Sequence, residues 1–228
     1  MEKHSTPLKD IVNIPGFKSL TADEIALIEN NSNVISYRNG DVILRQNTMT
    51  SHVMFIKSGL VKVYKEGKSY KTIILKIATS GSFLGLMSLF GDKTYHYSAS
   101  SISNSQIIFI DVGVFNSIIS KNGVFSSHLM RQISMEGLYI LDKLMNQAHK
   151  QLPGRIADVL LFFSKKIYHS NIFDLPLTRR ELAEFACTTK ESFIRTLTEF
   201  KNDRIINLNK RQVEIISIDI LQTLSKLG

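Results

Sequence analysis

The segment LTRRELAEFACTTKESFIR, residues 177–195, decides how the C-terminal third of the chain folds. Thr178 and Glu181 have the spacing of a capping box, in which the threonine hydroxyl accepts from a backbone amide and the glutamate reaches back to the threonine amide. Thr188 and Glu191 repeat this spacing ten residues later. Two helix starts so close together leave room for only a tight turn, so the segment predicts a helix-turn-helix.

The apolar residues of this segment give each helix a buried face. Leu182 and Phe185 would point inward from the first helix, and Phe193, Leu197 and Phe200 from the second at positions i, i+4 and i+7. The opposite face of the second helix carries Lys190, Glu191, Ile194, Arg195 and Thr198. Arginine can donate two hydrogen bonds to guanine and glutamate can accept from cytosine, so this face is typical of a major-groove reader. The alternative is a pair of solvated helices in an ordinary bundle.

Residues 204–216 follow as a predicted β-hairpin that turns at Asn209 and Lys210. Its basic residues, Lys210 and Arg211, are placed to meet phosphate. The hairpin would be the wing of a winged helix-turn-helix.

Within residues 34–111, short strand-like runs of apolar residues are separated by turn residues at regular spacing. The turns are at 39–41, 57–59 and 66–68, and the predicted strands are at 42–44, 52–56, 60–64, 72–77 and 106–110. This pattern predicts an antiparallel sandwich or barrel. Before it, Thr21 and Glu24 form a third capping-box pattern at the start of a short helix.

Residues 124–151 predict one long helix with two apolar stripes, one of which continues to Leu152. The first stripe is Leu138, Leu141, Met145, Ala148 and Leu152, and the neighbouring face carries Ile133, Ile140 and Leu144. Two stripes need two partners, which would be the chain's own domain and a second copy of the helix. The alternative is a helix wholly buried in one monomer. Pro153 and Gly154 are expected to break this helix, so that the C-terminal helical unit begins at Arg155.

The composition excludes several classes of protein. The chain has 228 residues, a formal net charge of +8 and a single cysteine, Cys187. Collagen-like, disulfide-scaffold and disordered chains are excluded, and the positive charge favours a polyanionic partner. One cysteine fits a reducing compartment and supplies neither a disulfide nor a cysteine-ligated cluster. Because residues 1–10 are polar and no apolar run approaches ~20 residues, we expect a cytoplasmic protein without a membrane span.

Together these segments resemble the Crp/Fnr family of bacterial transcription regulators. Residues 177–195 resemble the family's winged-helix signature and PGRIA, 153–157, its hinge. RNGDVIL at 38–44, FIKSGLVKVY at 55–64 and GSFLG at 81–85 resemble successive strands of its cyclic-nucleotide-type β-roll. One departure is Cys187, which stands where the family usually has the turn glycine, so the turn must form without glycine's freedom at positive φ.

The resemblance implies a domain organisation and a function for each part of the chain. The fold class is α+β, with an N-terminal antiparallel, jelly-roll-like β-roll over 1–122, a long dimerisation helix over 123–152 and a winged helix-turn-helix over 153–228. The expected base-reading residues are Lys190, Glu191, Ser192 and Arg195, and the expected DNA-backbone contacts are Arg179, Thr188, Thr189, Lys210 and Arg211. The implied partners are an inverted repeat in double-stranded DNA, a second copy of the chain and RNA polymerase, and no enzymatic activity is expected.

The effector pocket is where the family pattern fails. In cAMP-binding members a glutamate binds the ribose and an Arg-Ser pair binds the cyclic phosphate, but Leu86 and Tyr97-Ser98 stand at these positions. The loss of the arginine argues against cAMP as the effector. The ligand-touching positions on the long helix are Ile140 and Leu141. The residues expected to line the pocket are Leu86, Met87, Tyr97, Ser98, Ile140 and Leu144.

Such a pocket would hold haem, an apolar metabolite or nothing. His96 or Met87 would be the haem ligand, and the alternative is a surface-loop histidine and a core methionine. A rival from another class is a cupin-like small-molecule-binding protein or enzyme, which does not bind DNA and, if metal-dependent, needs clustered histidine and glutamate ligands. The histidines form no His-x-His pair and stand at His4, His52, His96, His128, His149 and His169. No metal site is therefore expected.

Overall fold

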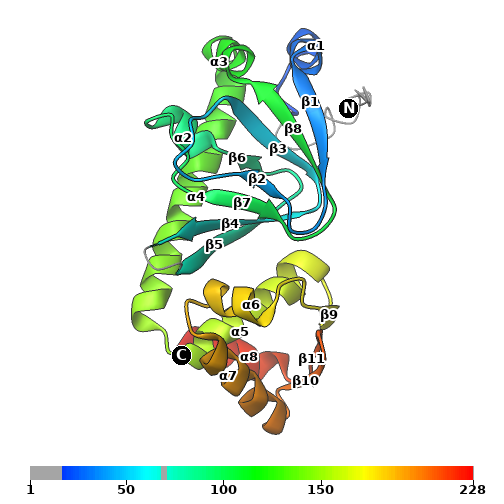
Figure 1. Cartoon of the computed structure of the whole chain (residues 1–228), viewed down its shortest axis with the longest axis vertical. Coiled ribbons are helices and arrows are strands. Elements are labelled where there is room, and N and C mark those ends of the chain that lie inside the picture. The colour runs from blue at the N-terminus through cyan, green and yellow to red at the C-terminus, as the bar shows by residue number, and fades with distance from the viewer. Residues whose placement is uncertain (1–16, 68–70, 228) are drawn as a thin grey trace. The chain divides into compact units, whose positions relative to one another are not determined.

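The computed structural model describes residues 17–67 and 71–227, which form two compact units (Figure 1). One unit comprises the described residues up to Lys71 together with Leu75–Leu138. The other comprises Thr72–Ile74 and the described residues from Tyr139 onward. The predicted polar segment 1–10, His4 and the turn residue Lys68 lie outside the described residues.

The first unit contains two four-stranded sheets with strand orders β1-β8-β3-β6 and β2-β7-β4-β5 (Figure 1). The strands are β1 (Ser32–Tyr37), β2 (Val42–Leu44), β3 (His52–Ser58), β4 (Leu60–Glu66), β5 (Thr72–Thr79), β6 (Phe83–Leu84), β7 (Ser98–Ser101) and β8 (Ser105–Asp111). All five strands predicted from the sequence are present, so the antiparallel β-roll is confirmed. The sequence did not reveal β7, since its residues Ser-Ala-Ser-Ser show no apolar alternation although all four are buried.

An aromatic core joins the β1-β8-β3-β6 sheet of this unit to its helices α1 (Ala22–Asn30), α2 (Leu86–Phe90) and α3 (Val112–Lys121). Phe17, Phe55 and Phe83 pack edge to face, with ring centroids 4.7 Å (Phe17 to Phe55) and 4.8 Å (Phe55 to Phe83) apart. The predicted capping box at the start of α1 is confirmed, because Thr21 and Glu24 exchange both expected hydrogen bonds.

The long helix α4 spans Gly123–His149, close to the predicted 124–151. Its N-terminal half buries Phe125 and Leu129 in the core of the first unit. Farther along, the predicted stripe is uncovered: Leu138, Leu141 and Met145 are each more than half exposed. Large apolar side chains left in water along one helix face mark a surface that binds a partner.

The second unit is built from helices and a small sheet. Its elements are α5 (Leu152–Phe162), a π-helical segment (Phe163–Tyr168), β9 (Ile172–Asp174), α6 (Arg179–Phe185), α7 (Lys190–Asn202), β10 (Ile206–Asn209), β11 (Gln212–Ile215) and α8 (Ile218–Leu227). The sheet has the order β10-β11-β9 (Figure 1). This unit therefore has the winged helix-turn-helix architecture that the sequence predicted.

The break between the long helix and the C-terminal unit was misplaced by the sequence analysis. The chain leaves helical geometry at Gln151, and Pro153 and Gly154 lie inside the first turn of α5. Proline is favoured in a first helical turn because the amide hydrogen it lacks would have no partner there. Pro153 therefore starts the next helix instead of ending the previous one.

Candidate nucleic-acid interface and effector pocket

Two capped helix starts position the helix-turn-helix, as predicted, but the second cap is Thr189. At the start of α6 the full capping box of Thr178 and Glu181 is present. At the start of α7 the hydroxyl of Thr189 accepts from the amide of Ser192, 3.2 Å away. The amide of Thr188 donates to the carbonyl of Ala183 and closes the turn. The predicted box of Thr188 and Glu191 is therefore wrong by one residue, because Thr188 belongs to the turn.

The turn itself uses a strained backbone. Cys187 has φ of 53°, the left-handed region that glycine adopts without cost and other residues rarely adopt. This confirms the expectation that the turn forms without a glycine. Phe185 and Ala186 before it are buried, and Leu182 of α6 and Phe193, Leu197 and Phe200 of α7 form the predicted buried faces.

The outer face of α7 is free for a ligand. Lys190, Glu191 and Arg195 are exposed, and Ser192 is half-exposed. Glu191 and Arg195 stand one helical turn apart, yet they form no ion pair with each other or with any other described residue. A helix face with opposite charges at i and i+4 normally gains by pairing them. Their separation leaves an acceptor and a guanidinium donor available to base edges.

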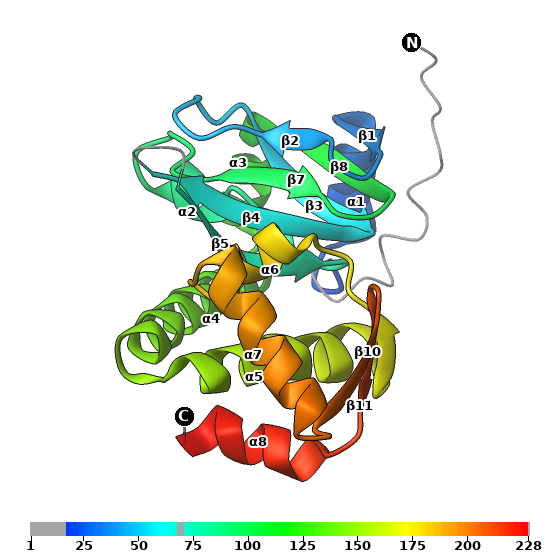
Figure 2. The same cartoon turned by 60° about the horizontal axis from the view of Figure 1, so that its bottom comes forward.

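The wing carries the other predicted contacts (Figure 2). Lys210 and Arg211 are exposed at the tip of the hairpin, where Lys210 has φ of 53°. Asn209 still pairs with Gln212, so the turn residues are Lys210 and Arg211, and the predicted turn at Asn209 and Lys210 is wrong by one residue. Arg179 is half-buried, and its Nη2 donates to the carbonyl of Lys210 at 2.6 Å. Burial and the nearby Arg211 lower the pKa of Arg179, and its Nη1 is buried without a partner. Two neighbouring guanidinium groups, one of which has a donor without a partner, favour the binding of an anion beside them.

Of the six residues expected to line the effector pocket, four lie in the first unit, and Ile140 and Leu144 lie in the second. Leu86 is buried in the core and borders a cavity, whereas Met87 and Leu144 are exposed and Ile140 is half-exposed. Tyr97, which precedes β7, and Ser98, which begins it, are both buried, and their hydroxyls hydrogen-bond to backbone amides. The Tyr97 hydroxyl accepts from the amide of Gly85 at 2.8 Å, and the Ser98 hydroxyl accepts from the amide of Gln46 at 3.0 Å. Burial raises the pKa of Tyr97, so its hydroxyl stays neutral.

A cavity of about 370 Å³ in the first unit is lined by charged residues that the sequence analysis missed. Lys76 of β5 and Arg131 of α4 face it together with His128 and Glu136, and Lys76 forms an ion pair with Glu136. The signal in the sequence was Lys76, the one charged residue in the apolar strand TIILKIAT. A half-buried lysine in such a strand needs an anionic partner.

The candidate haem ligands lie on the surface. His96 is exposed and its Nε2 lies 2.8 Å from Asp92 Oδ2, and Met87 is also exposed. Among the described residues, no group of three or more His, Cys, Asp or Glu is arranged to hold a metal ion. Within the same residues, no helix is both long and apolar enough to cross a membrane.

Two family models match this chain. Residues 34–122 match the cyclic nucleotide-binding domain, and residues 154–224 match the Crp-like helix-turn-helix domain. The first match covers the β-roll and α3, and the second runs from α5 to α8.

Similar proteins extend over most of the chain. The cAMP-activated global transcriptional regulator CRP of Salmonella typhimurium is 21% identical over 78% of this chain and 87% of its own length. The structure of FixK2 from Bradyrhizobium japonicum superposes with a TM-score of 0.78 at 19% identity, covering 86% of this chain and 98% of that one. The c-di-GMP responsive regulator CLP of Xanthomonas campestris gives a TM-score of 0.74 at 20% identity, covering 86% and 99%. At these identities the structural likeness establishes the shared fold.

Proposed function

The chain belongs to the Crp/Fnr family of DNA-binding transcription regulators, and from this premise we propose that it acts as a homodimer that recognises an inverted repeat in double-stranded DNA. The observation that carries the proposal is the outer face of α7, where Lys190, Glu191 and Arg195 are exposed and unpaired. Members of this family are regulators without enzymatic activity, so the cupin-like enzyme is set aside.

Base reading is assigned to α7. Arg195 donates to guanine O6 and N7, and Glu191, one turn earlier, accepts from a cytosine amine. Lys190 and Ser192 stand at the start of the same helix, where a recognition helix enters the major groove. Each half-site therefore contains a G·C pair contacted on both strands.

Phosphate binding is assigned to the residues around the wing. Arg179 has a buried donor without a partner beside Arg211, so a phosphate oxygen would satisfy it. Lys210 and Arg211 extend this positive surface. Thr189 caps α7 and Thr188 ends the turn before it, and helix-start amides and hydroxyls commonly bind phosphate.

Dimerisation is assigned to α4, through the exposed stripe of Leu138, Leu141, Met145 and Ala148. We keep the functional division into an effector-sensing β-roll over 1–122, a dimerisation helix over 123–152 and a DNA-binding domain over 153–228. Such a bacterial regulator works in the cytoplasm, on DNA and in contact with RNA polymerase.

The effector is assigned to the cavity beside Lys76 and Arg131 in preference to the pocket expected from the sequence. The cavity carries two cations, and among the described residues only Lys76 is paired with a carboxylate. An effector that displaces Glu136 from Lys76 would alter the contact between β5 and α4 within the first unit. Haem finds no support here, because His96 and Met87 lie on the surface.

We expect cAMP to have no effect on this protein. At millimolar cAMP neither the melting temperature nor the affinity for DNA should change, because Tyr97 and Ser98 already use their hydroxyls and a ligand without differential binding shifts no equilibrium. Thermal unfolding and DNA titration with and without cAMP measure this, and 5′-AMP is the matched control. A rise in melting temperature with cAMP alone would contradict the prediction.

Charge removal on the wing should weaken binding without changing sequence preference. Lys210→Ala or Arg211→Ala is expected to lower the affinity for all DNA sequences alike. Each is also expected to lower the slope of log affinity against log salt by about 1, since each lysine or arginine releases about one counterion from DNA. Titrations of preferred and scrambled duplexes at several salt concentrations measure both quantities. A loss confined to the preferred duplex would show that the wing reads bases.

The proposed function is tested by selecting genomic fragments with the purified protein and sequencing those that are bound. We expect a common inverted repeat with a G·C pair in each half-site. Recovery of fragments without any shared sequence would contradict sequence-specific regulation.

A further inference from the structure

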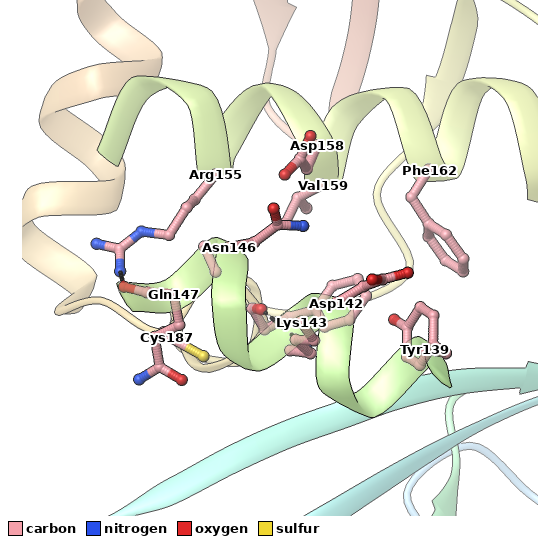
Figure 3. Close-up of a pocket in the computed structure, with 12 residues that line it drawn as sticks. Tyr139, Asp142, Lys143, Asn146, Gln147, Arg155, Asp158, Val159, Phe162 and Cys187 are labelled. Atoms are coloured by element: carbon pink, nitrogen blue, oxygen red, sulfur yellow. Dashed lines mark hydrogen bonds between the residues drawn. The ribbon is translucent and has the colours of Figure 1, made fainter. Parts of the chain in front are cut away.

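A second cavity lies wholly within the DNA-binding unit and plays no part in the interface described above (Figure 3). Its volume is about 200 Å³, and most of its wall is apolar. The apolar side chains come from α4, α5 and the end of α6 with the following turn: Tyr139, Val159, Phe162, Phe185 and Ala186. Because an apolar cavity of ~150 Å³ can hold benzene, this one has room for a ligand with one aromatic ring.

Arg155 at the edge of this cavity has an unsatisfied donor. Its Nη1 donates to the carbonyl of Gln147 at 3.4 Å, but its Nε is buried and has no partner. A buried charged donor without an acceptor is costly. Arg155 also lies near the start of α5, whose first turn has no acidic residue and whose N-cap, Gln151, provides no side-chain cap. The positive end of the helix adds to the charge of the guanidinium.

The carboxylates of the cavity do not neutralise Arg155. Asp158 is already occupied, because its two oxygens accept from Lys150 at 2.7 Å and from Ser225 at 2.6 Å. The Asp142 carboxylate lies on the side of Tyr139 and Phe162, and the Arg155 guanidinium lies on the opposite side, beside Gln147 (Figure 3). The vacant acceptor position is therefore at the Arg155 end.

Lys143 connects the cavity to the helix-turn-helix. Its Nζ donates to the carbonyl of Phe185 at 3.2 Å and lies 4.2 Å from the centre of the Phe185 ring. Burial lowers the pKa of Lys143 to about 8. Phe185 ends α6, and Ala186 and Cys187 form the turn that leads into α7. A ligand in the cavity would thus contact the residues that set the start of the recognition helix.

We propose that this cavity is a binding site for a small aromatic monocarboxylate, with its ring against the wall formed by Tyr139, Phe162 and Phe185 and its carboxylate on Arg155. The site is independent of the proposed dimer. Tyr139, Asp142, Lys143 and Asn146 follow each other at helical spacing on one face of α4, and Leu138, Leu141 and Met145 define another. Binding to the cavity does not rest on the proposed DNA-binding function, but its effect on DNA affinity does.

The test uses benzoate, with benzylamine and benzyl alcohol as probes of the same size and different charge, titrated calorimetrically into the full chain. Benzoate should bind, and benzylamine should bind at least tenfold more weakly. Arg155→Gln should lower the affinity for benzoate by roughly 10- to 100-fold, as expected for loss of a charge-assisted hydrogen bond. Arg38→Gln removes an exposed arginine of the other unit that lines neither of the two cavities described, and it is the control, which should bind benzoate as the unmodified protein does.

Two further measurements keep the outcome decisive. Arg155→Lys retains the charge but removes Nε, and it should bind benzoate more weakly than the unmodified protein while melting at a similar temperature. DNA affinity measured with and without benzoate reports the coupling through Phe185. Absence of benzoate binding, equal affinity in Arg155→Gln, or tighter binding of benzylamine would overturn the proposal. Benzoate binding by a protein that failed to bind any DNA would contradict the proposed function and leave the site intact.

Discussion

Replacing Leu141 and Met145 together by glutamate is expected to convert a dimer into a monomer and to reduce binding to the preferred DNA site by roughly 10³-fold or more. Both side chains are more than half exposed on α4, so their loss removes little from the core of the monomer. In a two-fold interface each substitution occurs twice and would bury four carboxylates against apolar surface, which is strongly unfavourable. The expected loss of affinity is the ordinary gap between specific and non-specific binding.

Sedimentation velocity and DNA titration of the same sample measure this pair of effects. The matched control is Met49→Glu with Phe90→Glu, which makes the same change at two exposed apolar positions of the β-roll unit. The control should stay dimeric and bind the site normally. If the α4 variant sediments as an intact dimer, the stripe is not the interface.

Arg195→Ala is expected to cost about 1–3 kcal/mol of binding free energy on the preferred site and to relax the preference at one base pair. Arg195 is exposed and unpaired, so its removal leaves no buried partner behind and should not affect folding. Competition titrations with duplexes altered at each position measure both effects.

Lys226→Ala is the control for Arg195→Ala, because it removes an equally exposed charge from α8, on which no DNA contact is proposed. It should leave the preference unchanged. A uniform loss of affinity in Arg195→Ala, with the preference intact, would make α7 a phosphate-contacting element and would require another reader.

The sequence predicted the elements with strong periodicity. The apolar spacing of Phe193, Leu197 and Phe200 defined the buried face of α7, and the strand-like runs at 52–56 and 60–64, with turn residues between them, defined β3 and β4. It did not reveal β7, whose buried serines make their contacts through backbone pairing with β2 and β4. The burial of these small polar residues depends on strands distant in the sequence, so a local pattern cannot show it.

Helix boundaries were less predictable than helices. Thr188 and Thr189 both fit a cap, and the choice depends on the hydrogen bond from the Thr188 amide to Ala183, which exists only once the turn has closed. Pro153 was compatible with the end of one helix or with the start of the next. The extended backbone of Gln151 shows that Pro153 lies at the start of α5.

The exposed charged face of α7 followed from the sequence, whereas the cavity beside Lys76 and Arg131 did not. Exposed charges on one helix face require only helical periodicity. The cavity of Lys76, Arg131 and Glu136 forms only when β5 lies beside a helix about sixty residues farther along the chain, and only the three-dimensional structure shows this contact. Relatives with different effectors share this fold, since one is described as cAMP-activated and another as c-di-GMP responsive. The fold therefore does not identify the effector.

The central claim, that two copies of α7 read one inverted repeat, is tested most directly by changing the spacing of the half-sites. In the natural repeat the half-sites should lie about one helical turn, ~34 Å, apart. Inserting about five base pairs between them turns one half-site by about half a turn, to the opposite side of the duplex. We predict that affinity for the selected site then falls to the level of unrelated DNA, roughly 10³-fold or more. An affinity that is unchanged by the insertion would show that each copy binds alone, and it would contradict the account.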